Sequence, residues 1–224
     1  MEVRAQVTPR YATTLSSEIV GRIVSLPVRE GESFVEGQEL AAIDCASYEA
    51  RLTQADAQTR RNERKAQALR LLDQRGATGK VELELAEIDV AASRAERQLA
   101  AIDVSRCTIN APFSGSVTGL KVKNHQYVPV GEQIISILSN RELEVEMLVP
   151  SRWLAWLTTG RHFTIHIDEL DQDFPASVTR LAADIDPVSQ SVKVFATVTG
   201  DFPSLSPGMS GLARFNVPEP EPAQ

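Results

Sequence analysis

The sequence has no long apolar run, few aromatic residues and no basic leader at its N-terminus. A membrane-spanning helix needs about 18–20 consecutive apolar residues, and no stretch of the chain approaches that length. The first residues (MEVRAQVTP) lack the basic and then apolar pattern of a secretory signal. We therefore expect either a cytosolic protein or one whose targeting segment has been removed. Because aromatic residues make up only 5% of the chain, its core must be built from aliphatic side chains.

Runs of Lys and Arg are absent as well. With 23 Lys and Arg residues against 30 Asp and Glu residues, the net charge is −7, which favours solubility and disfavours nucleic-acid binding. We expect no nucleic acid among the partners. The length of 224 residues allows a sizeable core in one or two domains.

Signatures of catalysis and cofactor binding are missing too. The sequence has no phosphate-binding loop, no GxSxG elbow and no pairing of a Cys with a His. His162 and His166 stand four residues apart in a run with strand character, which places them about 13 Å apart, too far to share a metal. An acidic run without the glycine spacing of an EF-hand, which we interpret as a solvated loop, comprises Asp168, Glu169, Asp171 and Asp173. We expect no enzyme, no cofactor and no metal site.

An internal repeat is the clearest feature that the sequence does contain. Residues 18–43 resemble residues 112–137 at a constant spacing and without a gap. Aligned pairs include Gly21 with Gly115, Ile23 with Val117, Gly37 with Gly131 and Ile43 with Ile137. Each half consists of short β-rich runs separated by tight turns in which glycine permits a positive φ. Because neither half can bury its apolar face alone, we expect the halves to pack together as a small sandwich.

Between the two halves, residues 46–105 have a different character. This segment has no proline, contains glycine only at Gly76 and Gly79, and is rich in good helix formers. Apolar and small residues recur at alternating spacings of four and three, which is typical of a coiled-coil seam. The first stripe comprises Tyr48, Leu52, Ala55, Thr59, Asn62, Ala66 and Leu69, and the second comprises Val81, Leu85, Ile88, Ala92, Ala95, Leu99 and Ile102.

The two stripes predict an antiparallel helical hairpin. If the chain reverses over residues 76–79, with Gly76 ending the first helix, Tyr48 comes to face Ile102. At about 1.5 Å per residue, each arm reaches roughly 40 Å. Asn62 lies within the seam, where it either fixes the register at a cost in stability or is simply solvated.

The two cysteines lie at the ends of this hairpin. Cys45 directly precedes the first helix and Cys107 follows the second, so the register of the hairpin brings them together at its base. In an oxidising compartment a disulfide there would join the hairpin to the β-module and stabilise the fold by roughly a few kcal/mol. The sequence favours a Cys45–Cys107 bond, with two adjacent free thiols as the alternative.

The remainder of the chain is typical of an all-β module. Residues 150–157 have the character of one or two helical turns closed by Gly160, and we interpret Trp153 and Trp156 on them as packing anchors. Strand-like runs lie at 143–149, 163–167, 176–181, 191–199 and 211–217. Together with a further strand expected within residues 3–15, they predict a small antiparallel barrel.

The predicted fold is mainly β with an inserted α-helical hairpin. Its parts are a split lipoyl- or biotinyl-like β-sandwich, an antiparallel coiled-coil hairpin and a small antiparallel β-barrel. The expected boundaries are residues 17–44 with 108–138 for the sandwich, 46–105 for the hairpin and 3–16 with 139–217 for the barrel. The tail over 218–224, rich in proline and glutamate, is expected to be disordered.

This order of half-motif, hairpin, half-motif and barrel resembles that of the HlyD-like membrane fusion proteins, the periplasmic adaptor subunits of Gram-negative efflux and secretion pumps. The resemblance covers almost the whole chain, and its most specific element is the IxAPFxGxV pattern within residues 108–117. The other matching segments are residues 20–24, 28–31, 35–40, 130–133, 186–192 and 205–209.

The resemblance implies an adaptor without catalytic activity that serves the export of small molecules or other cargo. An inner-membrane transporter, whose class the sequence does not reveal, would contact the barrel end, and the hairpin tip would dock onto an outer-membrane channel. Copies of such adaptors associate into rings, often hexamers. The full-length protein is expected in the periplasm, tethered to the inner membrane by an anchor or signal that this chain does not contain.

The resemblance also makes the hairpin tip the expected binding site. Tips in this family often carry an Arg, a Leu and a Ser that touch the helices of the channel. Leu72 fits this set, whereas Ala68 and Gly79 stand where Arg and Ser are usual. The candidate tip residues are Arg70, Leu72, Arg75, Gly76, Thr78 and Gly79, with Arg64 nearby.

Two other functions remain open at this point. A biotinyl or lipoyl carrier domain has the same β-fold, but it needs an exposed Lys in the connection between the halves, where residues 46–105 lie. A periplasmic protein that binds a metal or a drug is the other alternative.

Overall fold

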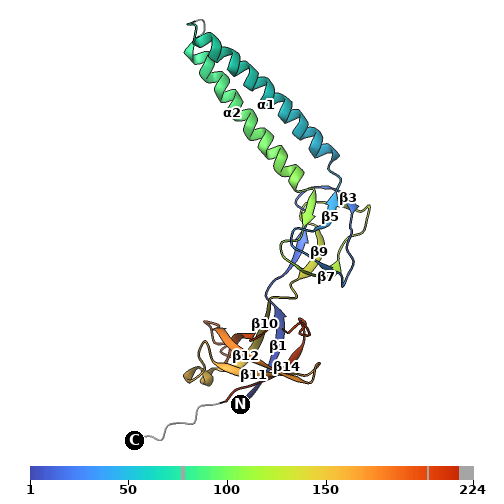
Figure 1. Ribbon diagram of the computed structural model, residues 1–224, viewed down its shortest axis with the longest axis vertical. Coiled ribbons are helices and arrows are strands. Elements are labelled where there is room, and N and C mark those ends of the chain that lie inside the picture. The colour runs from blue at the N-terminus through green and yellow to red at the C-terminus, as the bar shows by residue number, and fades with distance from the viewer. Residues whose placement is uncertain (77–78, 201, 217–224) are drawn as a thin grey trace. The chain divides into compact units, whose positions relative to one another are not determined.

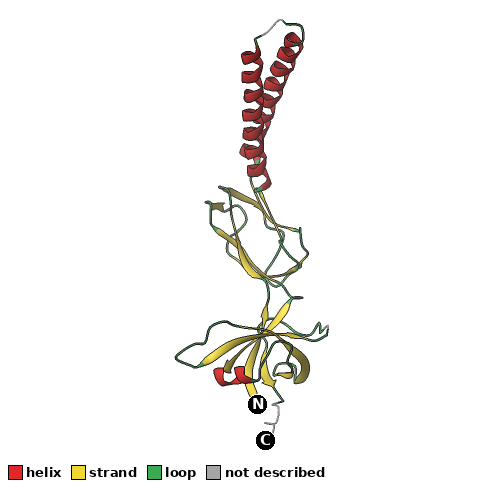
Figure 2. Ribbon diagram, turned by 90° about the vertical axis from the view of Figure 1, so that its left-hand side faces the viewer, coloured by secondary structure: helices red, strands yellow, loops and turns green. Residues whose placement is uncertain are grey.

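The computed structural model describes residues 1–76, 79–200 and 202–216. The protein is mainly β, with a closed six-stranded barrel, two four-stranded sheets and two long helices (Figures 1 and 2). The predicted fold class is therefore confirmed. The chain divides into two compact units, of which one contains the barrel and the other contains both helices and most of the two sheets.

The barrel is antiparallel and closes on itself. Its strands follow the order β1-β10-β13-β12-β11-β14, and β14 pairs back with β1. The strand bounds are β1 Glu2–Pro9, β10 Leu143–Pro150, β11 His162–Ile167, β12 Gln172–Leu181, β13 Ser191–Val198 and β14 Ser210–Arg214. Each run that was expected to be a strand after residue 142 therefore forms one.

Alternate side chains of these strands fill the interior of the barrel. Val7 and Ile165 are fully buried members of this core. The expected short helix is a 3-10 helix, η1 (Ser151–Ala155), which places Trp153 in the core against Phe215. Trp153 is thus a packing anchor, as predicted.

Two four-stranded sheets form the β-module of the other unit. One sheet has the order β2-β9-β7-β4, and the second has the order β6-β5-β3-β8. The strand bounds are β2 Ala12–Ser16, β3 Gly21–Ser25, β4 Ser33–Phe34, β5 Glu39–Ile43, β6 Thr108–Asn110, β7 Gly115–Leu120, β8 Tyr127–Val128 and β9 Gln133–Leu138. Each sheet thus contains strands from both halves of the repeat.

The two repeat halves exchange hydrogen bonds reciprocally. The N–H of Gly31 donates to the carbonyl of Val117 (2.9 Å), and the N–H of the equivalent residue His125 donates to the carbonyl of Ile23 at the same distance. Both donors have a positive φ, 82° for Gly31 and 68° for His125, so the turn is kept although only the first half supplies glycine. The two halves are therefore hydrogen-bonded to each other, which agrees with the expectation that they pack together.

The expectation for the N-terminal run is only partly correct. We expected a strand of the barrel within residues 3–15 and assigned residues 3–16 to the barrel. That strand ends at Pro9, and residues 12–16 form β2, which pairs with β9 in the β-module. The physical reason lies in the repeat. β2 occupies the same position in its half as β6 does in the other half, so the repeat begins earlier than its apolar matches indicate.

Two helices, α1 (Ala46–Asp73) and α2 (Lys80–Ser105), run side by side as the predicted hairpin (Figures 1 and 2). Gly76 has a φ of 67° and donates its N–H to the carbonyl of Asp73, so it ends α1 as expected. No helix in the described part of the chain is long and apolar enough to cross a membrane. Thr78, Val217 and the expected tail over 218–224 lie outside the described residues.

Candidate partner-binding surface on the helical hairpin

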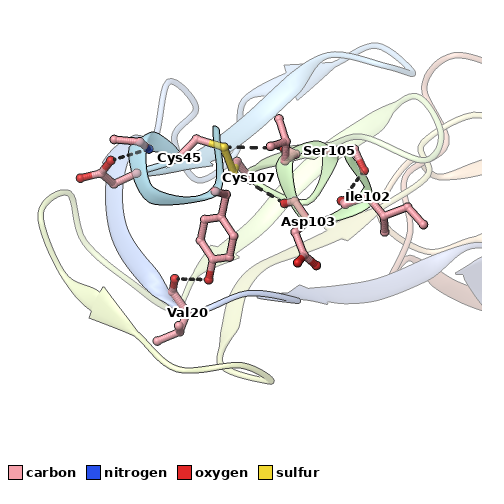
Figure 3. Close-up of a disulfide and its surroundings, with 10 residues drawn as sticks. Val20, Cys45, Ile102, Asp103, Ser105 and Cys107 are labelled. Carbon is pink, nitrogen blue, oxygen red and sulfur yellow. Dashed lines mark hydrogen bonds between the residues drawn. A yellow bond between two sulfur atoms is a disulfide. The ribbon is translucent and has the colours of Figure 1, made fainter. Parts of the chain in front are cut away.

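Cys45 and Cys107 form a disulfide at the base of the hairpin (Figure 3). Cys45 directly precedes α1, Cys107 follows the C-terminal cap of α2, and their Cα atoms lie 5.6 Å apart. Cys107 is buried, and its carbonyl accepts the N–H of Ile43 on β5 at 2.8 Å. The predicted clasp is thus confirmed, and it joins both ends of the hairpin to the β-module.

Two further contacts fix the base of the hairpin. The Tyr48 hydroxyl, in the first turn of α1, donates to the carbonyl of Val20 at 3.0 Å (Figure 3). Arg106, at the end of α2, forms an ion pair with Glu18 at 2.9 Å. Because both partners of the ion pair are exposed, it contributes at most about 1 kcal/mol. The disulfide and the Tyr48 bond are the stronger constraints on how the helices leave the sheets.

Polar side chains inside the seam form hydrogen bonds across it. Thr59 is buried, and its hydroxyl lies 3.0 Å from the carbonyl of Ser93 on α2 and 2.9 Å from that of Ala55 on its own helix. Asn62 donates from Nδ2 to the carbonyl of Asp89 at 3.2 Å. A slip of the helices would break these bonds, so the structure supports a register-fixing role for Asn62 over simple solvation.

The face of α2 that packs on α1 is not the predicted one. The predicted stripe of α1 does form the seam, with Thr59, Ala66 and Leu69 buried. On α2, however, the predicted stripe points away from α1, because its large members Val81, Leu85, Ile88, Leu99 and Ile102 are all exposed. The α2 side of the seam comprises Leu83, Ala86, Val90 and Ser93 instead. The predicted facing of Tyr48 and Ile102 is therefore wrong.

Close approach of the helices explains this difference. The small residues Ala66 and Ala86 are 2% and 1% exposed, and short side chains at the contact let the Thr59 hydroxyl reach a backbone oxygen of α2. Larger side chains would hold the helices apart and break that bond. The spacing pattern alone could not predict which face of α2 packs on α1, because α2 has apolar or small residues at spacings of four and three on two opposite faces.

Ion pairs between α1 and α2 border the seam. Most of their members are exposed, and Asp56 and Glu63 are half-buried, so each pair is weak on its own, but each fits only one register of the helices. The pairs are Lys65 with Asp89 (3.4 Å), Arg70 with Glu87 (2.8 Å), Glu63 with Arg94 (2.6 Å) and Asp56 with Arg97. The sequence analysis missed these pairs and named Arg70 only as a residue of the tip. The pairs could have been predicted, because the register implied by the two cysteines places opposite charges of the two helices face to face.

The predicted tip residues differ in how free they are to bind a partner. Arg70 is held by its ion pair with Glu87, whereas Leu72 is 42% exposed and its neighbour Leu71 is 54% exposed. Around the reversal, the exposed residues are Arg75, Gly76 and Gly79, and Thr78 lies outside the described part. Among its described residues, the tip thus presents a small apolar surface beside Arg75, for which no ion pair is seen there, and its role in binding remains a prediction.

His166 and the acidic residues of the run 168–173 pair with neighbouring side chains. No group of three or more metal-binding side chains occurs among the described residues. His166 lies with Nδ1 2.8 Å from Asp173 and Nε2 3.5 Å from Asp171, and Asp168 pairs with Arg4 at 2.6 Å. All four acidic residues are exposed, and residues 168–171 form a turn between β11 and β12, so the structure agrees with the solvated loop that we expected, in which carboxylates also pair with neighbouring side chains.

Backbone hydrogen bonds lower the pKa of Asp186, which lies between β12 and β13. Its Oδ1 accepts the N–H of Ser189 (2.8 Å) and the N–H of Val188 (2.9 Å), and both bonds favour the carboxylate form. The N–H of Asp186 also donates to the carbonyl of Ser191 at 2.9 Å. Asp186 thus shapes a turn within the matching segment 186–192.

The chain is similar to known proteins over most of its length. Residues 11–140 match the barrel-sandwich hybrid domain of RND membrane fusion proteins. The chain is 26% identical to nodulation protein NolF of Rhizobium meliloti (strain 1021), over 96% of this chain and 64% of that protein. It therefore spans less than two thirds of the length of this relative.

Two solved structures have a similar fold. The membrane fusion protein Spr0693 from Streptococcus pneumoniae R6 superposes with a TM-score of 0.82 at 18% identity, over 98% of this chain and 100% of that one. A MacA–MexA chimeric protein containing the Pseudomonas aeruginosa MexA α-hairpin domain superposes with a TM-score of 0.81 at 20% identity, over 95% of this chain and 79% of that one. At such identities the likeness concerns the fold alone.

Proposed function

The chain belongs to the RND membrane fusion proteins, and from this premise we propose that it is a periplasmic adaptor joining an inner-membrane transporter to an outer-membrane exit channel. One observation carries the proposal: a long helical hairpin interrupts the β-module and is fixed at its base by the Cys45–Cys107 bond. A fixed, projecting hairpin suits a protein that connects partners and performs no chemistry. The disulfide also fits an oxidising compartment such as the periplasm.

The hairpin tip and the barrel have separate roles in this proposal. The hairpin tip, with the exposed Leu71 and Leu72, contacts the channel together with the other candidate tip residues. The barrel contacts the transporter, and the segment between β12 and β13 offers the exposed apolar residues Ile185 and Val188 for this contact. Several copies, six in the usual case, form a ring around the path of the cargo, and the full-length protein is tethered to the inner membrane.

The carrier alternative is not favoured. A biotinyl or lipoyl carrier needs its modified Lys in the connection between the two halves of the β-module, and here α1 and α2 occupy that connection. Intact-mass spectrometry of the chain co-expressed with a biotin or lipoate ligase distinguishes the two. We expect the unmodified mass, whereas an addition the size of biotin or lipoate would contradict the adaptor role.

Co-purification tests the adaptor role directly. The full-length protein, isolated from detergent-solubilised membranes, is expected to retain an inner-membrane transporter that mass spectrometry can identify. Recovery of the protein without any membrane partner, after mild cross-linking, would argue against the proposal.

A further inference from the structure

A groove of about 790 Å³ opens on the barrel unit, beside the start of β10 and the end of β13. The residues that line it all belong to this one compact unit. Binding sites for small molecules commonly have volumes of about 300–1,000 Å³. The groove therefore has the size of a site for a small ligand.

The floor of the groove is apolar and firmly packed. It comprises Leu143, Val198, Phe202 and Leu205. Leu205 is only 6% exposed and belongs to the barrel core, and the Phe202 ring packs edge-on against Phe174 with ring centroids 5.0 Å apart. The N–H of Leu205 donates to the carbonyl of Phe202 at 3.0 Å, which fixes the turn between them. A ligand with an apolar body would gain free energy by covering this floor.

The charged side chains of the groove differ in whether they are paired. Glu142 pairs with Arg10 at 3.4 Å, and Glu144 pairs with Arg180 at 2.7 Å. Arg141 is exposed and forms no ion pair with a described residue. Among the described residues that line the groove, Arg141 thus supplies the one charge that is not compensated, and this charge is positive.

We propose that the groove binds a small amphipathic organic anion, such as an alkyl carboxylate of about ten carbons. The carboxylate pairs with Arg141, whose planar guanidinium donates two parallel hydrogen bonds to such a group. The alkyl chain lies on the apolar floor.

The pairing of the other charges selects an anion over a cation. A cationic amphiphile would bring its ammonium group near Arg10 and Arg141, while both carboxylates of the groove already have partners. A neutral amphiphile would cover the floor but leave Arg141 without a counter-charge. An anion is the ligand that satisfies both the floor and the arginine.

The site goes beyond the adaptor role, because it lets the adaptor itself recognise a small molecule. Its polar residues come from both chain connections between the barrel and the β-module. Arg10 follows β1, and Arg141 and Glu142 precede β10. The N–H of Arg10 donates to the carbonyl of Glu142 at 2.8 Å, so the two connections are joined beside the site.

Isothermal titration calorimetry of the 224-residue chain tests the selectivity. The probes are decanoate, decylammonium and decanol, which share one alkyl chain and differ in the charge of the head group. We expect one decanoate to bind per chain, about tenfold more tightly than either of the other probes. Equal affinities for the three probes would overturn the proposal, and so would the absence of decanoate binding below the concentration at which it aggregates.

Substitutions locate the site. Arg141→Gln removes the charge and should weaken decanoate binding about tenfold while leaving decanol binding unchanged. The matched control is Arg152→Gln, because Arg152 is an exposed arginine of the barrel unit that does not line the groove. It should bind decanoate as the original chain does. An equal loss in the two variants would show that decanoate adsorbs through general charge, which overturns the proposal.

A further variant tests the apolar floor. Val198→Thr preserves the volume of the side chain but adds a hydroxyl group, so it should weaken decanoate and decanol binding alike, by about threefold. Thermal unfolding followed by circular dichroism checks that each variant is folded. Unchanged affinities in folded Val198→Thr would place the ligand elsewhere and overturn the proposal.

The same acidic amphiphile chemistry occurs in free organic acids and in the lipids of a membrane. Co-sedimentation with phosphatidylglycerol vesicles distinguishes these sources. We expect decanoate to bind and the vesicles not to retain the chain, because the groove has room for a single alkyl chain. Sedimentation with vesicles that depends on Arg141 would identify a lipid surface as the partner and overturn the small-molecule site.

This inference and the proposed function fail separately. If decanoate binds but the full-length protein retains no membrane partner, the groove stands and the adaptor role is wrong. If a transporter co-purifies while decanoate does not bind, the adaptor role stands and the groove is not the proposed site.

Discussion

At the residue scale, the geometry of the hairpin base depends most on Cys45 and Cys107. The two residues are 62 positions apart in sequence, and the bond closes a loop that consists almost entirely of α1 and α2. The seam between the helices is thin and built largely from small residues. The isolated hairpin should therefore be only marginally stable, and the disulfide compensates by restricting the unfolded chain.

Replacing both cysteines by serine tests this compensation. We expect the free energy of unfolding of the hairpin unit to fall by about 2–4 kcal/mol, because the unfolded chain regains the freedom that the loop removes. Urea unfolding followed by far-UV circular dichroism, which is dominated by α1 and α2, measures the change. A reductant should produce a similar shift in the original chain and none in the double variant. Equal stability of the two proteins would contradict this account.

A second prediction at this scale concerns Asp186. Its pKa lies below the ordinary value of 3.8 because the N–H groups of Ser189 and Val188 bond to the carboxylate. The contribution to stability is therefore fully present above pH 3.8 and is lost as the pH falls through the lowered pKa. Compared with Asp186→Asn, the original chain should be more stable at neutral pH, and the difference should shrink in acid. A difference in stability that grows in acid would show that the sign is wrong.

At the scale of elements, α2 has two faces with the spacing of a seam, and only one of them packs on α1. The face of small residues forms the internal seam, where Ala66 packs near Ala86 and Thr59 reaches a backbone oxygen of α2. The face of larger residues on α2 stays exposed. The internal contact of the hairpin therefore uses the face of small residues alone.

Two substitutions, two positions apart and on opposite faces of α2, test which face is internal. Ala86→Leu should destabilise the hairpin by about 1–3 kcal/mol, because the seam has no room for a larger side chain. Ile88→Ala should change stability by no more than about 0.5 kcal/mol, because Ile88 is exposed. Thermal unfolding at low protein concentration, where copies are separate, measures both. If the stripe predicted from the sequence formed the seam, Ile88→Ala would destabilise the hairpin more than Ala86→Leu.

The sequence predicted an element correctly where its residue pattern was compatible with a single local structure. The stripe of α1, the reversal at Gly76, the strands after residue 142 and the Cys45–Cys107 bond agree with the structure. The face of α2 was not predictable from spacing, because the choice depends on how closely two backbones can approach. The place of β2 was missed because its equivalence to β6 lies in strand pairing, β2 with β9 and β6 with β5, and polar residues in β2 hide the similarity in sequence.

At the scale of the whole molecule, the chain combines a barrel unit with a β-module that carries the hairpin. The two repeat halves bond reciprocally, so the β-module stays intact although α1 and α2 interrupt the chain between them. The hairpin can therefore vary without loss of the module. This organisation suits an adaptor with separate surfaces for its two partners, the barrel for the transporter and the tip for the channel.

Site-specific photo-cross-linking in living cells tests the adaptor role most directly. A photoreactive residue is placed in the full-length protein at Leu72 on the tip or at Val188 on the barrel, both exposed. The account predicts that the probe at Leu72 captures an outer-membrane channel and that the probe at Val188 captures an inner-membrane transporter. The account would be contradicted if both probes captured only soluble proteins, or if both captured proteins of the same membrane.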